Sequence, residues 1–276
     1  MRLKIFYILF FVFFFNTIQA QSTASKQITK FTIAAPQLDT LKTIWVYLPK
    51  DYQNSQKSYP VVYMNDAQNL FDDETSYIGE WGIDEYMDQL TEHKSIIIGI
   101  EHGNKKRLDE LSPYTNEKYG GGKGDAYLTF IKNTLKPHVD VTYRTKPKAE
   151  HTTIFGASLG GLISFYATIK YPDTFGKAGV FSASFWFSEN IYDLVKTTEI
   201  PKSSRFYFLV GSDEGESMVP DHQRMVELLK SKGVNAEHIE NHIIEGGKHN
   251  EALWKSHFPN AYQWLTYNNT QLITND

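Results

Sequence analysis

Short apolar runs alternate with helical patterns along most of the chain, and this alternation restricts the fold more than any other feature. The runs are rich in Val and Ile and are bounded by polar or turn residues, as in strands that are buried on both faces of a sheet. We expect strands at Lys30–Ala35, Thr43–Leu48, Pro60–Met64, Ser95–Ile100, Thr152–Phe155, Ala178–Phe181, Arg205–Val210 and Ile239–Ile244.

Helical spacing of apolar residues fills the segments between these runs. Apolar side chains recur three and four positions apart in Ile83–Thr91, Tyr127–Leu135, Leu159–Ile169, Val219–Lys232 and Glu251–Leu265. Strands that alternate with helices favour a mostly parallel, twisted sheet with helices on both faces. We therefore predict a single α/β domain over residues 21–276, with antiparallel strands at its N-terminal end.

The composition is that of a globular protein and excludes several classes of function. Of the 276 residues, 41% are hydrophobic and 22% are charged, and the net charge of −4 leaves no basic footprint for nucleic acid. The chain contains no cysteine, which excludes disulfides, thiol nucleophiles and Cys-ligated metals. The histidines are scattered and form no H-E-x-x-H pair, so we expect neither a metal site nor a cofactor.

The first twenty residues have the pattern of a signal peptide. Arg2 and Lys4 precede the apolar run Ile5–Phe15, and Ile18-Gln19-Ala20 resembles a cleavage site. The alternative is an N-terminal membrane anchor, but the run is short for a bilayer span, which needs about 20 residues. We expect cleavage after Ala20, export to the periplasm or the medium, and no stable membrane insertion afterwards.

The strongest motif is Gly156-Ala157-Ser158-Leu159-Gly160, a G-x-S-x-G sequence. It follows one predicted strand and begins one predicted helix, which is the setting of a nucleophile elbow. Such a turn exposes the serine hydroxyl above the sheet, and the helix start places a positive dipole beneath a developing negative charge. Ser158 is therefore the candidate nucleophile.

A serine nucleophile needs a general base, and chain order selects it. In α/β-hydrolases the acid and then the histidine follow the serine. His249 lies between the last predicted strand and the last helix, from where it can reach the carboxyl edge of the sheet. The other late histidines lie in helical or strand patterns or on the final helix: His222, His238, His242 and His257.

Two adjacent carboxylates compete for the role of the acid that orients the histidine. Asp213 and Glu214 both follow the predicted strand Arg205–Val210, in the turn Gly211–Gly215. The usual position of the acid, three residues after such a glycine, favours Glu214, with Asp213 as the second choice.

An oxyanion hole requires two backbone donors near the nucleophile. One candidate is the amide of Leu159, and the other is the amide of Ala67, with Gln68 as the second choice. A carboxylate would oppose the oxyanion, so we interpret Asp66 as a residue that braces or caps this loop.

These motifs together resemble the putative esterase family of α/β-hydrolases, which includes esterase D, feruloyl esterases and siderophore esterases. The resemblance runs from about Thr43 to Leu265, and its carriers include Val62–Phe71, Tyr143–Thr145, Gly156–Leu162, Phe181–Trp186 and Gly246–Trp254. It implies an α/β-hydrolase fold and the hydrolysis of carboxylic esters without a cofactor, with Ser158 as nucleophile and His249 as base. Ala67 departs from the pattern, because many relatives have glycine at that position.

The resemblance does not determine which ester is the substrate. It implies a feruloyl or acetyl ester of a carbohydrate, a cyclic siderophore ester, or acyl transfer to a sugar; a non-catalytic carbohydrate-binding protein is the remaining alternative. Phe185 and Trp186 follow a predicted strand and are candidates for an aromatic wall. Arg107 and Glu110 lie in the long polar segment Asn104–Lys123, which we expect to be a loop bordering the site. The oligomeric state is not determined by the sequence.

Overall fold

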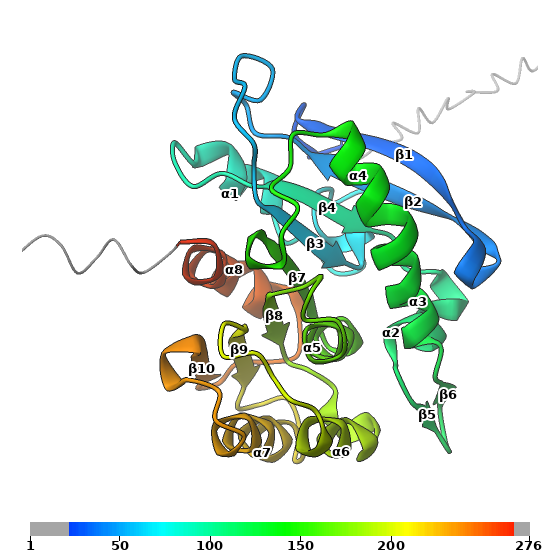
Figure 1. The fold of residues 1–276 in the computed structure, drawn as a ribbon, viewed down its shortest axis with the longest axis vertical. Helices are drawn as coiled ribbons and strands as arrows, with labels where there is room; N and C mark the ends of the chain where they lie inside the picture. The colour runs from blue at the N-terminus through cyan, green and yellow to red at the C-terminus, as the bar shows by residue number, and fades with distance from the viewer. Residues whose placement is uncertain (1–21, 268–276) are drawn as a thin grey trace, which may run out of the picture.

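A computed structural model describes residues 22–267 as a twisted sheet with helices on both faces (Figure 1). The predicted signal peptide, residues 1–20, lies outside the described residues. Within 22–267, every helix is too short or too polar to cross a membrane.

The central sheet has eight strands in the order β1-β2-β4-β3-β7-β8-β9-β10. Strands β1 and β2 pair antiparallel, as do β2 and β4, and all other pairs are parallel. The prediction of a mostly parallel sheet with antiparallel strands at its N-terminal end is confirmed. The strands are β1 (Ile28–Ala35), β2 (Thr40–Tyr47), β3 (Val61–Asn65), β4 (Ile96–Ile100), β7 (Thr152–Ala157), β8 (Lys177–Phe181), β9 (Arg205–Gly211) and β10 (Ile239–Ile244).

Two hydrophobic clusters lie on opposite faces of this sheet. Helices α1 (Ile83–Gln89) and α8 (Glu251–Thr266) belong to one cluster, and α5 (Leu159–Lys170) and α7 (Met218–Ser231) belong to the other. Successive residues of β3 point into different clusters: Val61 and Tyr63 into the α5 side, Val62 and Met64 into the α8 side. Burial on both faces explains why the strands are continuous apolar runs in the sequence.

Three segments differ from the prediction. The helix expected to end at Leu135 continues as α3 (Gly124–Phe130), a π-helical turn (Ile131–Leu135) and α4 (Lys136–Thr142). Helix α6 (Asn190–Thr197) was not predicted. The expected loop at 104–123 contains α2 (Arg107–Leu111) and a small hairpin of β5 (Thr115–Asn116) and β6 (Gly120–Gly121).

Candidate active site

Ser158 lies at the turn from β7 into α5, and its backbone is strained. Its φ of 59° and ψ of −123° are unusual for a residue with a side chain. The turn requires glycine on both sides of the serine. A Cβ on Gly156 would lie 2.6 Å from the carbonyl carbon of Gly160, and a Cβ on Gly161 would lie 2.7 Å from the Phe181 carbonyl oxygen. Close approach of strand and helix thus holds Ser158 at the carboxyl edge of the sheet.

His249 and Glu214 meet at the same edge, carried by the turns after β10 and β9. The Nδ1 atom of His249 lies 2.9 Å from Oε2 of Glu214. The two turns are in direct contact: a Cβ on Gly211 would lie 2.2 Å from the Gly247 carbonyl oxygen, to which the Asp213 amide donates at 2.8 Å. Because both turns are fixed to each other, so are the two side chains.

A hydrogen-bond network holds the Glu214 carboxylate, which is fully buried. Its Oε1 atom accepts hydrogen bonds from the Ser182 hydroxyl at 2.6 Å and the Gly211 amide at 2.7 Å. Ser182 in turn accepts a hydrogen bond from the Trp254 indole at 2.9 Å, and that ring packs edge-on against His249. Since a carboxylate only accepts, Nδ1 of His249 carries the proton and Nε2 is left as the basic nitrogen.

Asp213, the second candidate for the acid, points elsewhere. Its side chain is exposed, and among residues 22–267 it accepts a hydrogen bond only from the adjacent Ser212 hydroxyl, at 3.1 Å. Of the two carboxylates, the geometry therefore favours Glu214 as the partner of His249.

Ser158 and His249 line one cavity of about 360 Å³. The Ser158 hydroxyl lies 3.3 Å from the Ser184 hydroxyl, and within residues 22–267 no hydrogen bond joins it to His249. Catalytic hydrogen bonds are often long before substrate binds, so the shared cavity is the relevant observation. A larger hollow, about 510 Å³, is lined instead by residues at the amino ends of the strands, among them Pro60, Lys94, Thr153 and Lys177.

One wall of the catalytic cavity is apolar, and the sequence analysis missed it. Leu70, Tyr77, Ile78, Trp81 and Trp254 all line the cavity. Tyr77 and Ile78 are 82% and 66% exposed, so two large hydrophobic side chains stand at the rim. Their position within the polar stretch Asp72–Glu80 is the signal that would have identified them.

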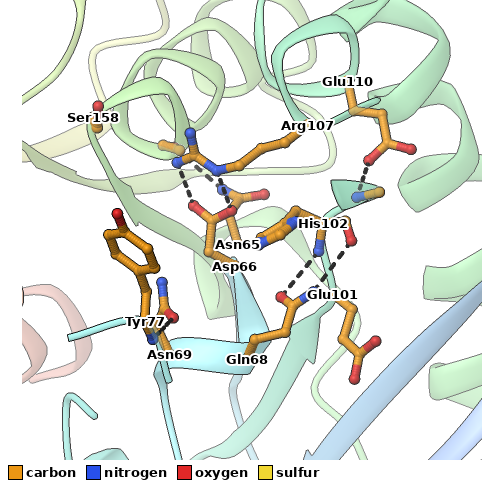
Figure 2. Close-up of polar contacts among 12 residues, drawn as sticks. Asn65, Asp66, Gln68, Asn69, Tyr77, Glu101, His102, Arg107, Glu110 and Ser158 are labelled. Atoms are coloured by element: carbon orange, nitrogen blue, oxygen red, sulfur yellow. Dashed lines mark hydrogen bonds and ion pairs between the residues drawn. The ribbon is translucent and has the colours of Figure 1, made fainter. Parts of the chain in front are cut away.

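A bidentate ion pair also lines the cavity (Figure 2). Arg107 donates from Nε and a terminal nitrogen to the two carboxylate oxygens of Asp66, at 2.7 and 2.8 Å. Burial is the largest single influence and lowers the pKa of Arg107, but the charge and hydrogen bonds of Asp66, with the nearby Tyr127 and Glu251, together outweigh it and raise the pKa. Asp66 therefore braces the loop after β3, as predicted, although it does not cap the 3-10 turn Ala67–Asn69.

Gln68 and His102 join this loop to the end of β4 (Figure 2). The Gln68 side chain exchanges two hydrogen bonds with the backbone of His102, each of 3.2 Å. His102 lines the cavity, and burial lowers the pKa of its imidazole, which favours a neutral ring. The sequence analysis did not identify His102 as a cavity residue.

Two of the expected substrate contacts are wrong. Phe185 is 1% exposed and packs in the α5-side core against Phe165 and Phe208. Glu110 is also buried, because it pairs with Lys42 at 2.5 Å and accepts a hydrogen bond from the Gly103 amide.

The remaining expected residues lie at or near the site. Arg107 lines the cavity, whereas Trp186 is 43% exposed, packs on Tyr119 and is not among the cavity residues. Leu159 is the first residue of α5, and Ala67 is fully buried at the loop after β3. The oxyanion-hole assignments to Leu159, Ala67 and Gln68 stay predictions.

The fold, with a serine at a strained turn between β7 and α5, defines an α/β-hydrolase. Residues 35–265 match the model of the family described as putative esterase. The chain belongs to this family, and it is a hydrolase of the esterase class.

Two relatives illustrate the range of the family. The chain is 30% identical over 234 residues to YbbA of Bacillus subtilis, itself uncharacterized, covering 80% of this chain and 90% of YbbA. It is 26% identical over 225 residues to an endo-1,4-beta-xylanase/feruloyl esterase of Xylanibacter ruminicola. That match covers 78% of this chain but only 28% of the relative.

Solved structures share the fold at low identity. A ferulic acid esterase has a TM-score of 0.68 at 18% identity, covering 87% of this chain and 96% of its own. The BES protein from Bacillus cereus has a TM-score of 0.70 at 18% identity, with 91% and 99% covered. For the enterobactin esterase FES from Shigella flexneri the TM-score is 0.69 at 18% identity, with 89% and 60% covered. At such identities the likeness shows the fold alone.

Proposed function

We propose that this chain is an exported serine esterase that hydrolyses carboxylic esters through an acyl-enzyme on Ser158. The observation that carries the proposal is the arrangement of His249 and Glu214. They form a hydrogen-bonded pair of 2.9 Å at the edge of the cavity that Ser158 also lines. This arrangement supplies a nucleophile, a base and an acid that fixes the tautomer of the base.

In the first half-reaction, Ser158 Oγ attacks the carbonyl carbon of the ester while Nε2 of His249 takes its proton. The amides of Leu159 and of Ala67, or of Gln68 as the second choice, stabilise the resulting oxyanion. Collapse of this intermediate breaks the ester bond, and the leaving alcohol takes the proton from His249. The acyl group then remains on Ser158.

In the second half-reaction, water attacks the acyl carbon and gives its proton to His249. Collapse releases the carboxylic acid, and the proton returns to Ser158 Oγ. Glu214 stays ionised throughout and stabilises the imidazolium.

For the substrate we propose an ester of an aromatic acid, of the feruloyl kind, attached to a carbohydrate. The exposed Tyr77 and Ile78, together with Trp81, provide an apolar surface beside Ser158 that suits a flat ring. The cavity volume falls within the range of small-molecule sites. An acetyl ester would leave this surface unused.

A siderophore ester is the second candidate, since the chain is 27% identical over 135 residues to the ferri-bacillibactin esterase BesA of Bacillus subtilis. That match covers 42% of this chain and 45% of BesA. Acyl transfer to a sugar remains a third outcome of the same chemistry, and it is distinguished by product analysis with a sugar acceptor present.

Fluorophosphonate labelling followed by intact mass tests the nucleophile. We expect one covalent adduct on the wild-type protein and none on Ser158→Ala. Ser184→Ala removes the neighbouring hydroxyl and should still label. An unlabelled wild type would indicate a non-catalytic binding protein. If the protein is labelled, a panel of feruloyl, acetyl and siderophore esters ranks its substrates.

Export is tested separately. N-terminal sequencing of protein from the native host should give Gln21 as the first residue of a single domain at 21–276. Recovery of Met1 in a membrane fraction would contradict cleavage.

A further inference from the structure

A cluster of three carboxylates lies at the start of α1, outside the proposed catalytic residues. Glu80, Asp84 and Glu85 each offer one oxygen, and these oxygens lie within 4.8 Å of one another. Glu80 is 6% exposed and Asp84 is fully buried, whereas Glu85 faces solvent. A site built this way has two buried ligands and one ligand at its entrance.

Two of the buried oxygens have no partner within residues 22–267. Oε2 of Glu80 and Oδ1 of Asp84 are inaccessible to solvent and accept no hydrogen bond. The other Asp84 oxygen accepts a hydrogen bond from the Ser25 amide at 2.6 Å, so only Oδ1 is left over. Burying a carboxylate oxygen without a partner costs free energy, which a proton or a cation would remove.

Nearby charges do not neutralise the cluster. The Lys255 ammonium of α8 lies near the cluster, 2.9 Å from where a Cβ on Gly82 would be. It nevertheless forms no ion pair with any of the three carboxylates.

We propose that Glu80, Asp84 and Glu85 bind Ca²⁺. The three carboxylates offer one oxygen each, and waters at the open side would complete the six to eight oxygens that Ca²⁺ takes in a flexible geometry. Mg²⁺ requires near-ideal octahedral geometry and keeps several waters, which suits a half-buried cluster of side chains less well.

The cation site is coupled to the wall of the catalytic cavity through Trp81. This residue lies directly beside Glu80 in the chain, lines the cavity and packs against Phe181 and Trp254. Its amide donates to the Asn69 carbonyl at 2.8 Å. A cation bound by Glu80 and Asp84 would stabilise the segment that positions Trp81, without taking part in ester cleavage.

Terbium provides a direct probe, because Tb³⁺ occupies Ca²⁺ sites and its emission is sensitised by a nearby tryptophan. We expect saturable emission that Ca²⁺ displaces at lower concentration than Mg²⁺. Ca²⁺ at a hundred times its Kd should raise the Tm by about 5 °C. Trp81→Phe should lose most of the emission but keep the Ca²⁺-dependent rise in Tm.

Glu85→Gln is the principal variant, since an exposed residue can be changed without unfolding the protein. It should weaken Ca²⁺ binding by about tenfold or more, whereas Glu92→Gln, an exposed acid just after α1, should bind as the wild type does. Lys255→Met should strengthen binding by removing a like charge. The proposal is overturned if Ca²⁺ neither displaces Tb³⁺ nor raises the Tm of the wild type, or if Glu85→Gln binds unchanged. If the cluster instead shares a proton, Glu80→Gln will be more stable than the wild type and Ca²⁺ will have no effect on either protein.

Discussion

Replacing Glu214 by glutamine should separate the role of the proposed acid from a general effect of charge. Oε1 of Glu214 accepts two hydrogen bonds, from Ser182 and the Gly211 amide. In the Glu214→Gln variant the side-chain amide oxygen would have to take this position, so the NH₂ group would face Nδ1 of His249. Nδ1 would then accept rather than donate, and Nε2 would carry the proton that it must be free to receive.

This reversal of the His249 tautomer determines how much kcat the Glu214→Gln variant should lose. Amide replacement of a triad acid lowers kcat by about 10⁴-fold where the geometry is kept, which corresponds to about 5.4 kcal/mol of activation free energy. Asp213→Asn removes the same charge from the same turn, but that side chain is exposed and, within the described part of the chain, hydrogen-bonds only to Ser212. It should change kcat by less than about threefold, as for an exposed charge.

The assay is kcat and KM for a chromogenic acetyl ester, with Tm values to verify that both variants fold. A Glu214→Gln enzyme within tenfold of the wild type would refute the assignment of the acid. If Asp213→Asn lost most of its activity while Glu214→Gln stayed active, the role of the acid would be assigned to Asp213. If neither variant lost activity, the acid would have to come from another part of the chain.

Three further predictions follow from the same structure. Ser158→Ala and His249→Ala should each reduce turnover to near background, and the double variant should lose little more, because nucleophile and base act together; additive losses measured by kcat would contradict this. Tyr77→Ser should raise KM for a feruloyl ester by about tenfold, from the lost apolar contact, and leave an acetyl ester nearly unchanged; equal effects on both esters would remove Tyr77 from the acyl site. Burial lowers the pKa of Lys177 to about 8. The unfolded chain therefore binds more protons at Lys177 above pH 8, and this residue alone should add about 1.6 kcal/mol of stability from pH 8 to 9.5; denaturant unfolding should show this difference in pH dependence between the wild type and Lys177→Met, and an equal pH dependence of the two proteins would contradict it.

The sheet was predictable because its strands are buried on both faces. Runs such as Pro60–Met64 and Ser95–Ile100 correspond to β3 and β4 within one residue at each end. Their short length and their content of Val and Ile favour a strand over a buried helical segment. Helix α6 was missed because it is short and its surroundings give no strong start or stop signal.

The helix through residues 124–142 shows how a local rule misleads. The apolar spacing of this segment stops at Leu135, and the proline at position 137 donates no hydrogen bond, so local rules favour a helix end there. In the structure the π-helical turn Ile131–Leu135 leads directly into α4, which has this proline within its first two residues. No sequence pattern predicts such a π-helical turn.

The position of a candidate site residue could be predicted where chain order and strand ends determine it. It could not be predicted where a partner distant in the sequence determines it. Glu214 and His249 follow strand ends, so their position at the carboxyl edge follows from topology. Glu110 was assigned to the substrate because it lies in the polar segment Asn104–Lys123, which was expected to border the site. Its actual partner, Lys42, is 68 residues earlier, and nothing in either local pattern links the two.

Ser182 is the residue for which partners distant in the sequence matter most to the proposed chemistry. It follows β8, is fully buried, and has a φ of 44°, a conformation that costs free energy for a residue with a side chain. That conformation places its hydroxyl between the indole of Trp254 and the carboxylate of Glu214. Trp254 also packs against His249, so one tryptophan on α8 contacts the base directly and the acid through Ser182. Three segments far apart in the sequence therefore fix one imidazole, and the strain at Ser182 is offset by hydrogen bonds that exist only in the folded chain. A search of the sequence for nucleophile, base and acid identifies the reacting groups, but the group that holds the acid in place becomes visible only when β8, β9 and α8 are assembled.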